Sequence, residues 1–401
     1  MNEFLPYARQ RVGNDDIAAV VDVLRGDWLT TGPTIEAFER ALGAEVNAPN
    51  TLVCSSGTAA LHLAALAIGL RPGDRVVVPA LTFVATANAA RLVGAEVVFA
   101  DVDPDTGLME AEHLDAALAR TGDHPACAVF PVHLNGQSPD MPTLAKIARE
   151  HGLMVVEDAA HALGTSYLDG NGGLAKVGEC RHSDLTAFSF HPVKTVAMGE
   201  GGALTGGDSA LIDHARRLRS HGIERDASAF KSADLGFDER GAANPWYYEM
   251  LEVGFNYRAS DIHCALGLSQ LAKLAQFTRE RARLVARYDA LLAPIAPLVR
   301  PIARALTSRP AWHLYVLRVD FAAAGSSRGA VMRALRERGI GTQVHYLPLH
   351  LQPYYRRRYG DLSLPGAEAY YADVLSLPLH TQMDETDVDR VVAALSEVLG
   401  K

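Results

Sequence analysis

Lys194 lies between an apolar run and a glycine-rich run. It follows the apolar run "FSFHPV" and precedes the glycine cluster "GEGG". A lone lysine usually packs its stem on the protein surface and holds its ammonium group in water. A lysine amine can also condense with an aldehyde, and an apolar run followed by glycines is a poor setting for an ordinary surface lysine. Lys194 is therefore a candidate for covalent chemistry with a carbonyl compound.

Asp158 ends a second apolar run, "LMVVED". Ligands of open α/β sheets collect at the carboxyl ends of the strands, so this carboxylate is well placed for a site. It could pair with a protonated ring nitrogen or, equally, cap a helix. Side chains alternate along a strand, which directs Glu157 to the opposite face and favours Asp158 as the functional carboxylate.

The turn "SSGTAAL" puts small hydroxyl residues and Gly57 where a strand-like run becomes a helix. Free backbone N–H groups at a helix start attract a phosphate, and glycine permits its close approach. Plain N-capping by Ser56 is the alternative. Ser189 could add a hydroxyl group to the same cradle. Phe83, which begins the next helical run, could stack on an aromatic ring or belong to the core.

These residues together match the needs of one cofactor. An enzyme that uses pyridoxal 5'-phosphate (PLP) requires a lysine, a carboxylate for the pyridinium nitrogen and a cradle for the phosphate. Their joint presence in one chain predicts a PLP site. No Gly-x-Ser-x-Gly turn indicates a hydrolase, and no spacing of histidines and carboxylates indicates a metal site.

Strand-like and helical patterns alternate in the first half of the chain. Apolar strand-like runs occur, with helical patterns between them, at 50–56, 74–80, 95–103, 126–133 and 153–160. Such alternation predicts right-handed crossovers and a mainly parallel sheet with helices on both faces. Residues 222–245 lack periodicity, which is typical of a functional loop or lid. Strand-like runs at 312–320 and 342–349, with helical patterns around them, predict a smaller C-terminal α/β domain.

The composition excludes several classes of function. With 48% hydrophobic and 21% charged residues, the chain suits one large or two medium globular domains. Its net charge of -9 argues against a nucleic-acid partner. The four scattered cysteines lack zinc or disulfide spacing, and neither a signal sequence nor a membrane-length apolar stretch is evident. We therefore expect a cytoplasmic protein that binds no membrane.

The sequence resembles the DegT/DnrJ/EryC1/StrS sugar aminotransferases over nearly its whole length. The resemblance is carried by "DWLTTGPTIEAFERALG", "SSGTAALHLAALAIGL", "PALTFVATANA", "EDAAHALG", "FSFHPVKTVAMGEGG" and "GFNYRASDIHCALGLSQL". It implies an α/β, PLP-dependent transferase fold of type I, like that of aspartate aminotransferase, with a large mainly parallel mixed sheet flanked by helices. It also implies an N-terminal segment packing near the small domain (1–24), a large PLP-binding domain (25–275) and a small C-terminal α/β domain (276–401).

The resemblance implies roles that agree with this chemistry. Lys194 would form the covalent link and move the proton, and Asp158 would pair with the pyridinium nitrogen. Further cofactor contacts are implied for Ser56, Gly57, Thr58, Phe83, His161, Ser189 and, from the other subunit of a homodimer, Asn256. His161 stands where many relatives have glutamine and would bond the ring hydroxyl. Substrate contacts are implied for Thr31, His191, Tyr257, Arg258, His345 and Tyr346; for both histidines and Tyr346 a structural polar role is the alternative.

Within the family, "EDAAHALG", "SFHPVK" and "WYYEMLEVGFNYR" are most similar to the transaminases of pseudaminic acid biosynthesis, a route to cell-surface polysaccharide. This similarity implies transfer of an amino group from L-glutamate to carbon 4 of a UDP-linked 4-keto sugar, UDP-2-acetamido-2,6-dideoxy-β-L-arabino-hexos-4-ulose. A dTDP- or GDP-linked 4-keto-6-deoxy sugar is the main alternative. PLP-dependent sugar dehydratases carry histidine in place of the lysine, so Lys194 argues against that reaction. A non-catalytic regulatory paralogue is the third possibility.

Overall fold

A seven-stranded sheet forms the centre of the molecule in the computed structural model, which describes residues 4–401. The strand order is β1-β9-β8-β5-β4-β2-β3, and β9 is antiparallel to both of its neighbours while all other pairs are parallel. The mainly parallel mixed sheet expected from the sequence is thereby confirmed. The strands are β1 (Asn50–Cys54), β2 (Arg75–Pro79), β3 (Glu96–Ala100), β4 (Ala128–Val129), β5 (Met154–Asp158), β8 (Leu185–Ser189) and β9 (Gly202–Gly206).

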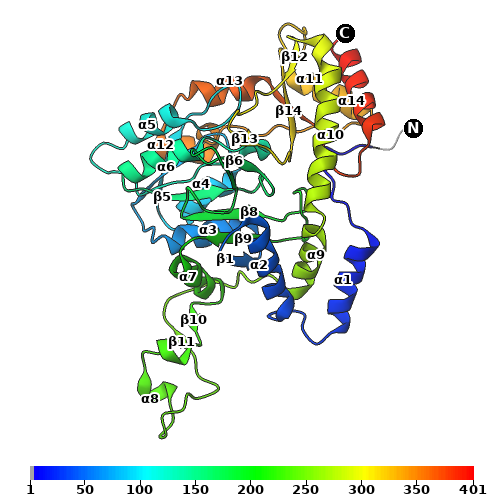
Figure 1. Cartoon of the computed structure of the whole chain (residues 1–401). Helices are drawn as coiled ribbons and strands as arrows, with labels where there is room; N and C mark the ends of the chain where they lie inside the picture. The colour runs from blue at the N-terminus through cyan, green and yellow to red at the C-terminus, as the bar shows by residue number, and fades with distance from the viewer. Residues whose placement is uncertain (1–3) are drawn as a thin grey trace.

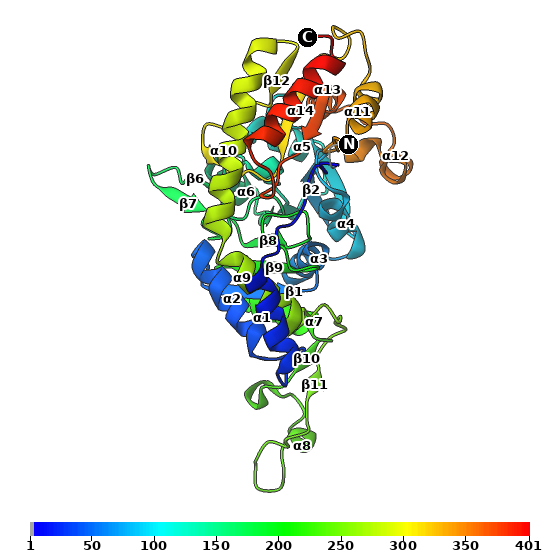
Figure 2. The same ribbon diagram turned by 90° about the vertical axis from the view of Figure 1, so that its right-hand side faces the viewer.

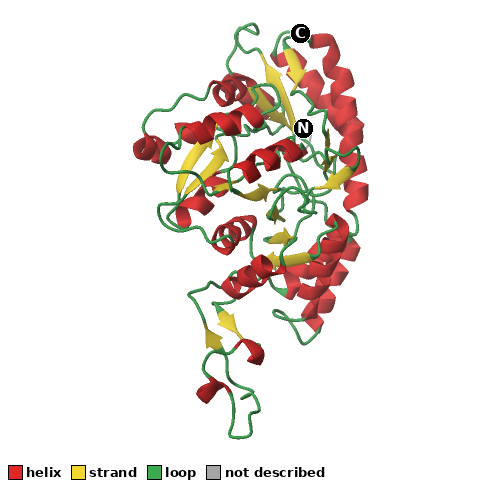
Figure 3. Cartoon of the chain, turned by 60° about the vertical axis from the view of Figure 1, so that its left-hand side comes forward, coloured by secondary structure: helices red, strands yellow, loops and turns green. Residues whose placement is uncertain are grey.

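Helices cover both faces of this sheet (Figure 3). They are α2 (Pro33–Val46), α3 (Gly57–Ala67), α4 (Val84–Leu92), α5 (Ala111–Ala119), α6 (Met141–Glu150), α7 (Ser209–Arg219) and α9 (Asp261–Leu271). Val76 and Val78 of β2 join the core under α3, α4 and α7, whereas Val77 joins the core under α2, α5 and α6. Burial on both faces explains why this strand is apolar at successive positions.

The strand expected at 126–133 is reduced to the two residues of β4. Pro131 follows closely and has no N–H group to donate to a neighbouring strand, which limits the ladder. A separate three-stranded sheet joins β6 (Ser166–Leu168), β7 (Leu174–Lys176) and β13 (Ser308–Arg309).

A second core lies between an antiparallel sheet and three helices near the C-terminus (Figure 1). The sheet has the order β12-β14-β15, with β12 (Val299–Pro301), β14 (Tyr315–Val319) and β15 (Val374–Leu377). The helices are α10 (Leu274–Leu292), α11 (Arg328–Glu337) and α14 (Glu385–Val398). The expected boundary at residue 276 falls inside α10 and stays an interpretation.

The strand expected at 342–349 does not form. Only Gln343 makes a bridge, to Ser376, and the remainder is a loop that ends in the short helix η4 (Leu349–Leu351). Pro348 cannot donate to a ladder, and the side chains of this loop line a cavity instead of a sheet face. The helices α12 (Pro353–Tyr359) and α13 (Pro365–Asp373) follow it.

The segment expected as a loop or lid forms an arm that projects from the body of the molecule (Figures 1 and 2). We call residues 222–254 the arm. Its base is the antiparallel pair β10 (Ile223–Glu224) and β11 (Glu249–Met250), and it also contains η2 (Ala227–Ala229) and α8 (Ala233–Gly236).

The N-terminal segment contacts both the C-terminal core and helix α9. Leu5 is buried in the C-terminal core and bridges to Ile340, whereas α1 (Asn14–Arg25) packs beside α9. Buried Asp16 accepts hydrogen bonds from Ser269 and Gln270, which fixes α1 in place. Residues 1–3 of the segment expected at 1–24 lie outside the described residues. No helix within residues 4–401 has the length and apolarity needed to cross a membrane.

Candidate active site

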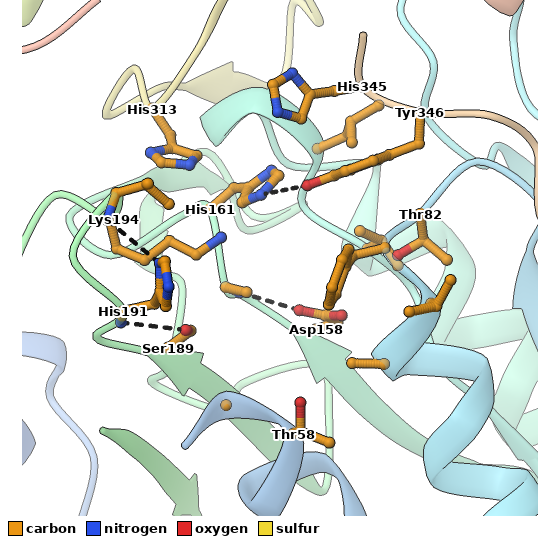
Figure 4. Close-up of a pocket in the computed structure, with 18 of the residues that line it drawn as sticks. Thr58, Thr82, Asp158, His161, Ser189, His191, Lys194, His313, His345 and Tyr346 are labelled. Carbon is orange, nitrogen blue, oxygen red and sulfur yellow. Dashed lines mark hydrogen bonds between the residues drawn. The ribbon is translucent and has the colours of Figure 1, made fainter. Parts of the chain in front are cut away.

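A cavity of about 600 Å³ opens where β5 and β8 end and α3 begins (Figure 4). This volume is typical of a small-molecule site, and the carboxyl ends of parallel strands are where such folds bind ligands. Most residues singled out in the sequence line it together, namely Ser56, Gly57, Thr58, Phe83, Asp158, His161, Ser189, His191, Lys194, His345 and Tyr346.

Lys194 extends into this cavity from the turn that follows β8 (Figure 4). Its backbone N–H donates to the carbonyl of His191 at 2.8 Å, which closes the turn. Loss of water around the ammonium group lowers the pKa of Lys194 to about 8, and the nearby charge of Asp158 only partly opposes this effect. The amine is therefore far easier to deprotonate than that of a surface lysine.

Asp158 presents a carboxylate held from two sides. Its Oδ1 accepts from the Ala160 N–H at 3.0 Å, and its Oδ2 accepts from Thr86 Oγ1 at 2.6 Å. Glu157 faces the other way, where it bonds His133 Nε2 at 2.5 Å, and this confirms the predicted alternation. The side chain of Asp158 is only 5% exposed.

The turn between β1 and α3 is built for close approach. Ser56 caps α3 by accepting from the Ala59 N–H at 3.1 Å, so the capping alternative is correct for its hydroxyl group. A Cβ atom on Gly57 would come within 2.7 Å of Ser189 Cβ, and one on Gly202 within 2.2 Å of the Ser56 carbonyl oxygen. Because Gly57 and Gly202 have no side chains, the N-terminus of α3, β8 and β9 can come close together at the cavity. The N–H groups of Gly57 and Thr58, at the start of α3, have no partner within the helix and can bind a phosphate.

His161 and Tyr346 form a hydrogen bond whose direction follows from their neighbours. The Asn135 N–H donates to His161 Nδ1 at 3.4 Å, and Tyr346 Oη lies 3.1 Å from His161 Nε2. Burial holds the pKa of His161 well below its usual value, so the ring is neutral. A backbone N–H can only donate; the ring hydrogen is therefore on Nε2 and points to the tyrosine oxygen. The hydroxyl hydrogen of Tyr346 is then left for an acceptor in the cavity.

His345 and His313 line the cavity next to His161 and Tyr346 (Figure 4). His345 Nδ1 lies 2.8 Å from Ser376 Oγ, and burial, with a further effect from Lys194, lowers its pKa to about 3. The ring of His313 lies 4.5 Å from that of His161, and its Nδ1 is buried without a partner. His313 lies in a strand-like run with no motif around it, so the sequence held no signal for its position.

Four predicted residues do not line the cavity of this chain: Thr31, Asn256, Tyr257 and Arg258. The hydroxyl group of Thr31 donates to the Thr30 carbonyl, and Asn256 is exposed. Tyr257 Oη lies 3.2 Å from His62 Nδ1. The arm also contributes no lining residue. The phosphate contact expected for Asn256 from the other subunit and the substrate contacts expected for Thr31, Tyr257 and Arg258 stay predictions.

The cavity fits PLP on its own chemistry. It combines a buried acceptor carboxylate, a lysine with a lowered pKa, and a helix start bordered by hydroxyl groups. Among residues 4–401 no group of three or more histidine, cysteine or acidic side chains is arranged to hold a metal ion.

The whole chain is similar to known proteins. It is 39% identical over 402 residues to the spore coat polysaccharide biosynthesis protein SpsC of Bacillus subtilis (strain 168), covering 99% of this chain and 98% of SpsC. The structure of Helicobacter pylori PseC, an aminotransferase involved in the biosynthesis of pseudoaminic acid, superposes with a TM-score of 0.87 at 27% identity and covers 99% of this chain and 100% of PseC.

Spr1654 of Streptococcus pneumoniae, in a PLP form, gives a TM-score of 0.86 at 29% identity and covers 99% of both chains. The same protein is also known in a form with pyridoxamine phosphate. The fold is therefore that of PLP-dependent aminotransferases, and the cofactor is PLP. Residues 10–396 match one family throughout, and the protein belongs to the DegT/DnrJ/EryC1/StrS aminotransferase family of PLP-dependent sugar aminotransferases.

Proposed function

We propose that the protein transfers an amino group from L-glutamate to carbon 4 of a UDP-linked 4-keto-6-deoxy sugar. The observation that carries this proposal is the convergence of Lys194, Asp158 and the start of α3 on one cavity. When bound, PLP supplies the electron sink that makes the hydrogen on an amino-bearing carbon removable. The residues of the chain then bind, orient and move that proton.

Lys194 is the group that moves the proton. A general base must be neutral to accept one, and a pKa of about 8 leaves roughly one amine in ten neutral at pH 7. At the usual lysine pKa the neutral fraction would be roughly one in 3,000. The half-buried position of Lys194 thus prepares the amine for catalysis without a second base.

Asp158 and the helix start hold the two ends of the cofactor. Each oxygen of the carboxylate has one donor within the protein and keeps a lone pair for a ring N–H on the cavity side. Gly57, Thr58 and Ser189 lie where the phosphate would meet the positive end of α3. Phe83 borders the cavity and is exposed, so its ring is free to stack on the cofactor.

The acceptor sugar would contact His191, His345 and Tyr346, which all line the cavity. Because His161 donates to Tyr346, the hydroxyl group of Tyr346 can donate its own hydrogen to an oxygen of the ligand. We assign the partner subunit's Asn256 to the phosphate and expect a homodimer with shared sites.

Two similarities support the choice of sugar. PseC is named for pseudoaminic acid biosynthesis, and SpsC for spore coat polysaccharide biosynthesis. We therefore propose UDP-2-acetamido-2,6-dideoxy-β-L-arabino-hexos-4-ulose as the acceptor. The test is to incubate pure protein and L-glutamate with UDP-, dTDP- and GDP-linked 4-keto sugars and to identify the products by mass and NMR. A specificity constant at least about tenfold higher for a rival, or about 1.4 kcal/mol, would overturn the choice of sugar but not the transfer reaction.

The same experiment distinguishes amino transfer from dehydration and from regulation. A dehydratase would release a deoxygenated sugar without nitrogen, whereas a regulatory paralogue would bind PLP and leave every sugar unchanged. Lys194 in the cavity beside Asp158 favours amino transfer over both. Bleaching of the bound PLP absorbance by L-glutamate alone would show the first half of the reaction directly.

A further inference from the structure

Thr86 joins the first turn of α4 to the catalytic carboxylate. Its Oγ1 lies 2.6 Å from Asp158 Oδ2, 2.8 Å from Thr82 Oγ1 and 3.2 Å from the Phe83 carbonyl oxygen. The Thr82 and Thr86 side chains are 2% and 0% exposed. A threonine in a helix usually bonds a carbonyl one turn back, but here the shortest contact is to a residue 72 positions away.

The hydrogens in this chain of contacts have only one arrangement. Thr86 has a single hydroxyl hydrogen, and an ionised carboxylate can only accept. A distance of 2.6 Å is in the range of a charge-assisted hydrogen bond, so that hydrogen is donated to Asp158. Thr82 must then donate to Thr86 at 2.8 Å. The hydrogen bonds run from Thr82 through Thr86 to the carboxylate.

We infer that Thr86 is a positioning residue that sets the orientation of the Asp158 carboxylate, with Thr82 orienting Thr86. The Ala160 N–H fixes one carboxylate oxygen from the strand that carries Asp158, and Thr86 fixes the other from α4. These two hydrogen bonds restrict rotation of the carboxylate about the Cβ–Cγ bond of Asp158. Phe83 is the N-cap residue of the same helix. The segment 82–86 thus places the aromatic ring and the carboxylate relative to each other.

This inference rests on the proposed role of Asp158, and the test separates the two. Thr86→Val removes the hydroxyl group and keeps the shape, Thr86→Ser keeps the hydroxyl group, and Asp158→Asn changes the carboxylate itself. Thr121→Val is the matched control, because buried Thr121 donates to the Leu118 carbonyl at 2.7 Å and does not line the cavity. For each protein we would measure the Kd for PLP, the pH midpoint of the visible band of the PLP-loaded protein, and thermal unfolding without PLP.

We expect Thr86→Val to bind PLP about tenfold more weakly and to shift the pH midpoint of the band, because one carboxylate oxygen has lost its donor. Thr86→Ser should restore both values, and Thr121→Val should lose thermal stability while keeping them. Unchanged Kd and midpoint in Thr86→Val, with both altered in Asp158→Asn, would overturn the inference and leave only a structural role. Unchanged values in Asp158→Asn would overturn the proposed role of Asp158. If Thr86→Val does not fold, Thr86→Ala repeats the test without the added methyl group.

Discussion

Glu157 and Asp158 are adjacent in β5, yet their carboxylates bond to different parts of the molecule. Glu157 is fully buried and bonds His133, Ser183 and Thr186, whereas Asp158 faces the cavity. The bonds to His133 and the two hydroxyl groups hold the pKa of Glu157 below its usual value, against the opposing effect of burial. One carboxylate therefore serves the fold and its neighbour serves the site.

Exchange of each carboxylate for its amide tests this division. Asp158→Asn should lose most turnover with little change in unfolding, since a neutral amide cannot keep the ring nitrogen protonated. Glu157→Gln should lower the free energy of unfolding by about 1–3 kcal/mol, because buried hydrogen bonds to a charged group are disturbed. Urea unfolding and steady-state rates of both variants measure the two effects. Equal losses of stability would contradict the division.

Replacement of Lys194 by alanine should lower the rate of amino transfer by a factor on the order of a thousand or more, while the protein stays folded. Lys194 is the proposed base, and loss of one half-buried side chain removes little from a large core. Exposed Lys146, which lies 3.9 Å from Glu150, provides the control: Lys146→Ala should leave the rate unchanged. Wild-type turnover in Lys194→Ala, without added amines, would end the assignment.

The lowered pKa of Lys194 predicts a pH-dependent stability in the protein without PLP. The folded protein releases the Lys194 proton near pH 8 and the unfolded chain near pH 10.5, so between these values the unfolded chain binds more protons and stability rises with pH. At pH 7 Lys194→Met should therefore be more stable than the wild type. This advantage should shrink as the pH rises from 8 to 10.5. Paired urea unfolding curves at both ends measure the change, and a constant difference would contradict it.

A site shared between subunits predicts complementation between two inactive proteins. In a mixture of Lys194→Ala with an Asn256→Ala Arg258→Ala protein, half of the dimers are hybrids, and each hybrid has one intact site. Activity should therefore return to about a quarter of the wild-type value after subunits exchange. Mass spectrometry of the mixture verifies the exchange. No recovered activity in a verified hybrid would place each site within one chain.

The parts of the site that the sequence predicted are those with a local signal. Lys194 follows an apolar run and precedes glycines, Asp158 ends a strand, and Gly57 begins a helix, so each lies where its neighbours dictate. The turn between β1 and α3 lies where the sequence predicts it, because a strand and a helix meet there at a glycine, although β1 ends at Cys54 and not at residue 56.

The remaining contacts depend on residues far apart in the chain. His161 meets Tyr346 across 185 positions, and Thr86 meets Asp158 across 72. No periodicity connects such pairs, and only the folded chain brings them together. The segment around His345 has the alternation of a strand, but its side chains face a cavity, and this is why the predicted strand was wrong. The sequence of residues 222–245 predicts an irregular segment, yet the base of the arm is a short antiparallel pair.

The N-terminal segment has a consequence for the order in which the protein is made. Tyr7 lines the cavity, and its carbonyl accepts from the Leu379 N–H at 3.0 Å, while Leu5 bridges to Ile340. Leu5 and Tyr7 thus depend on partners that lie more than 300 positions further along the chain. Contacts of such long sequence separation form late in folding. The part of the cavity that Tyr7 lines is therefore completed only after residues 340–379 have been synthesised, and a chain that ends before them cannot build it.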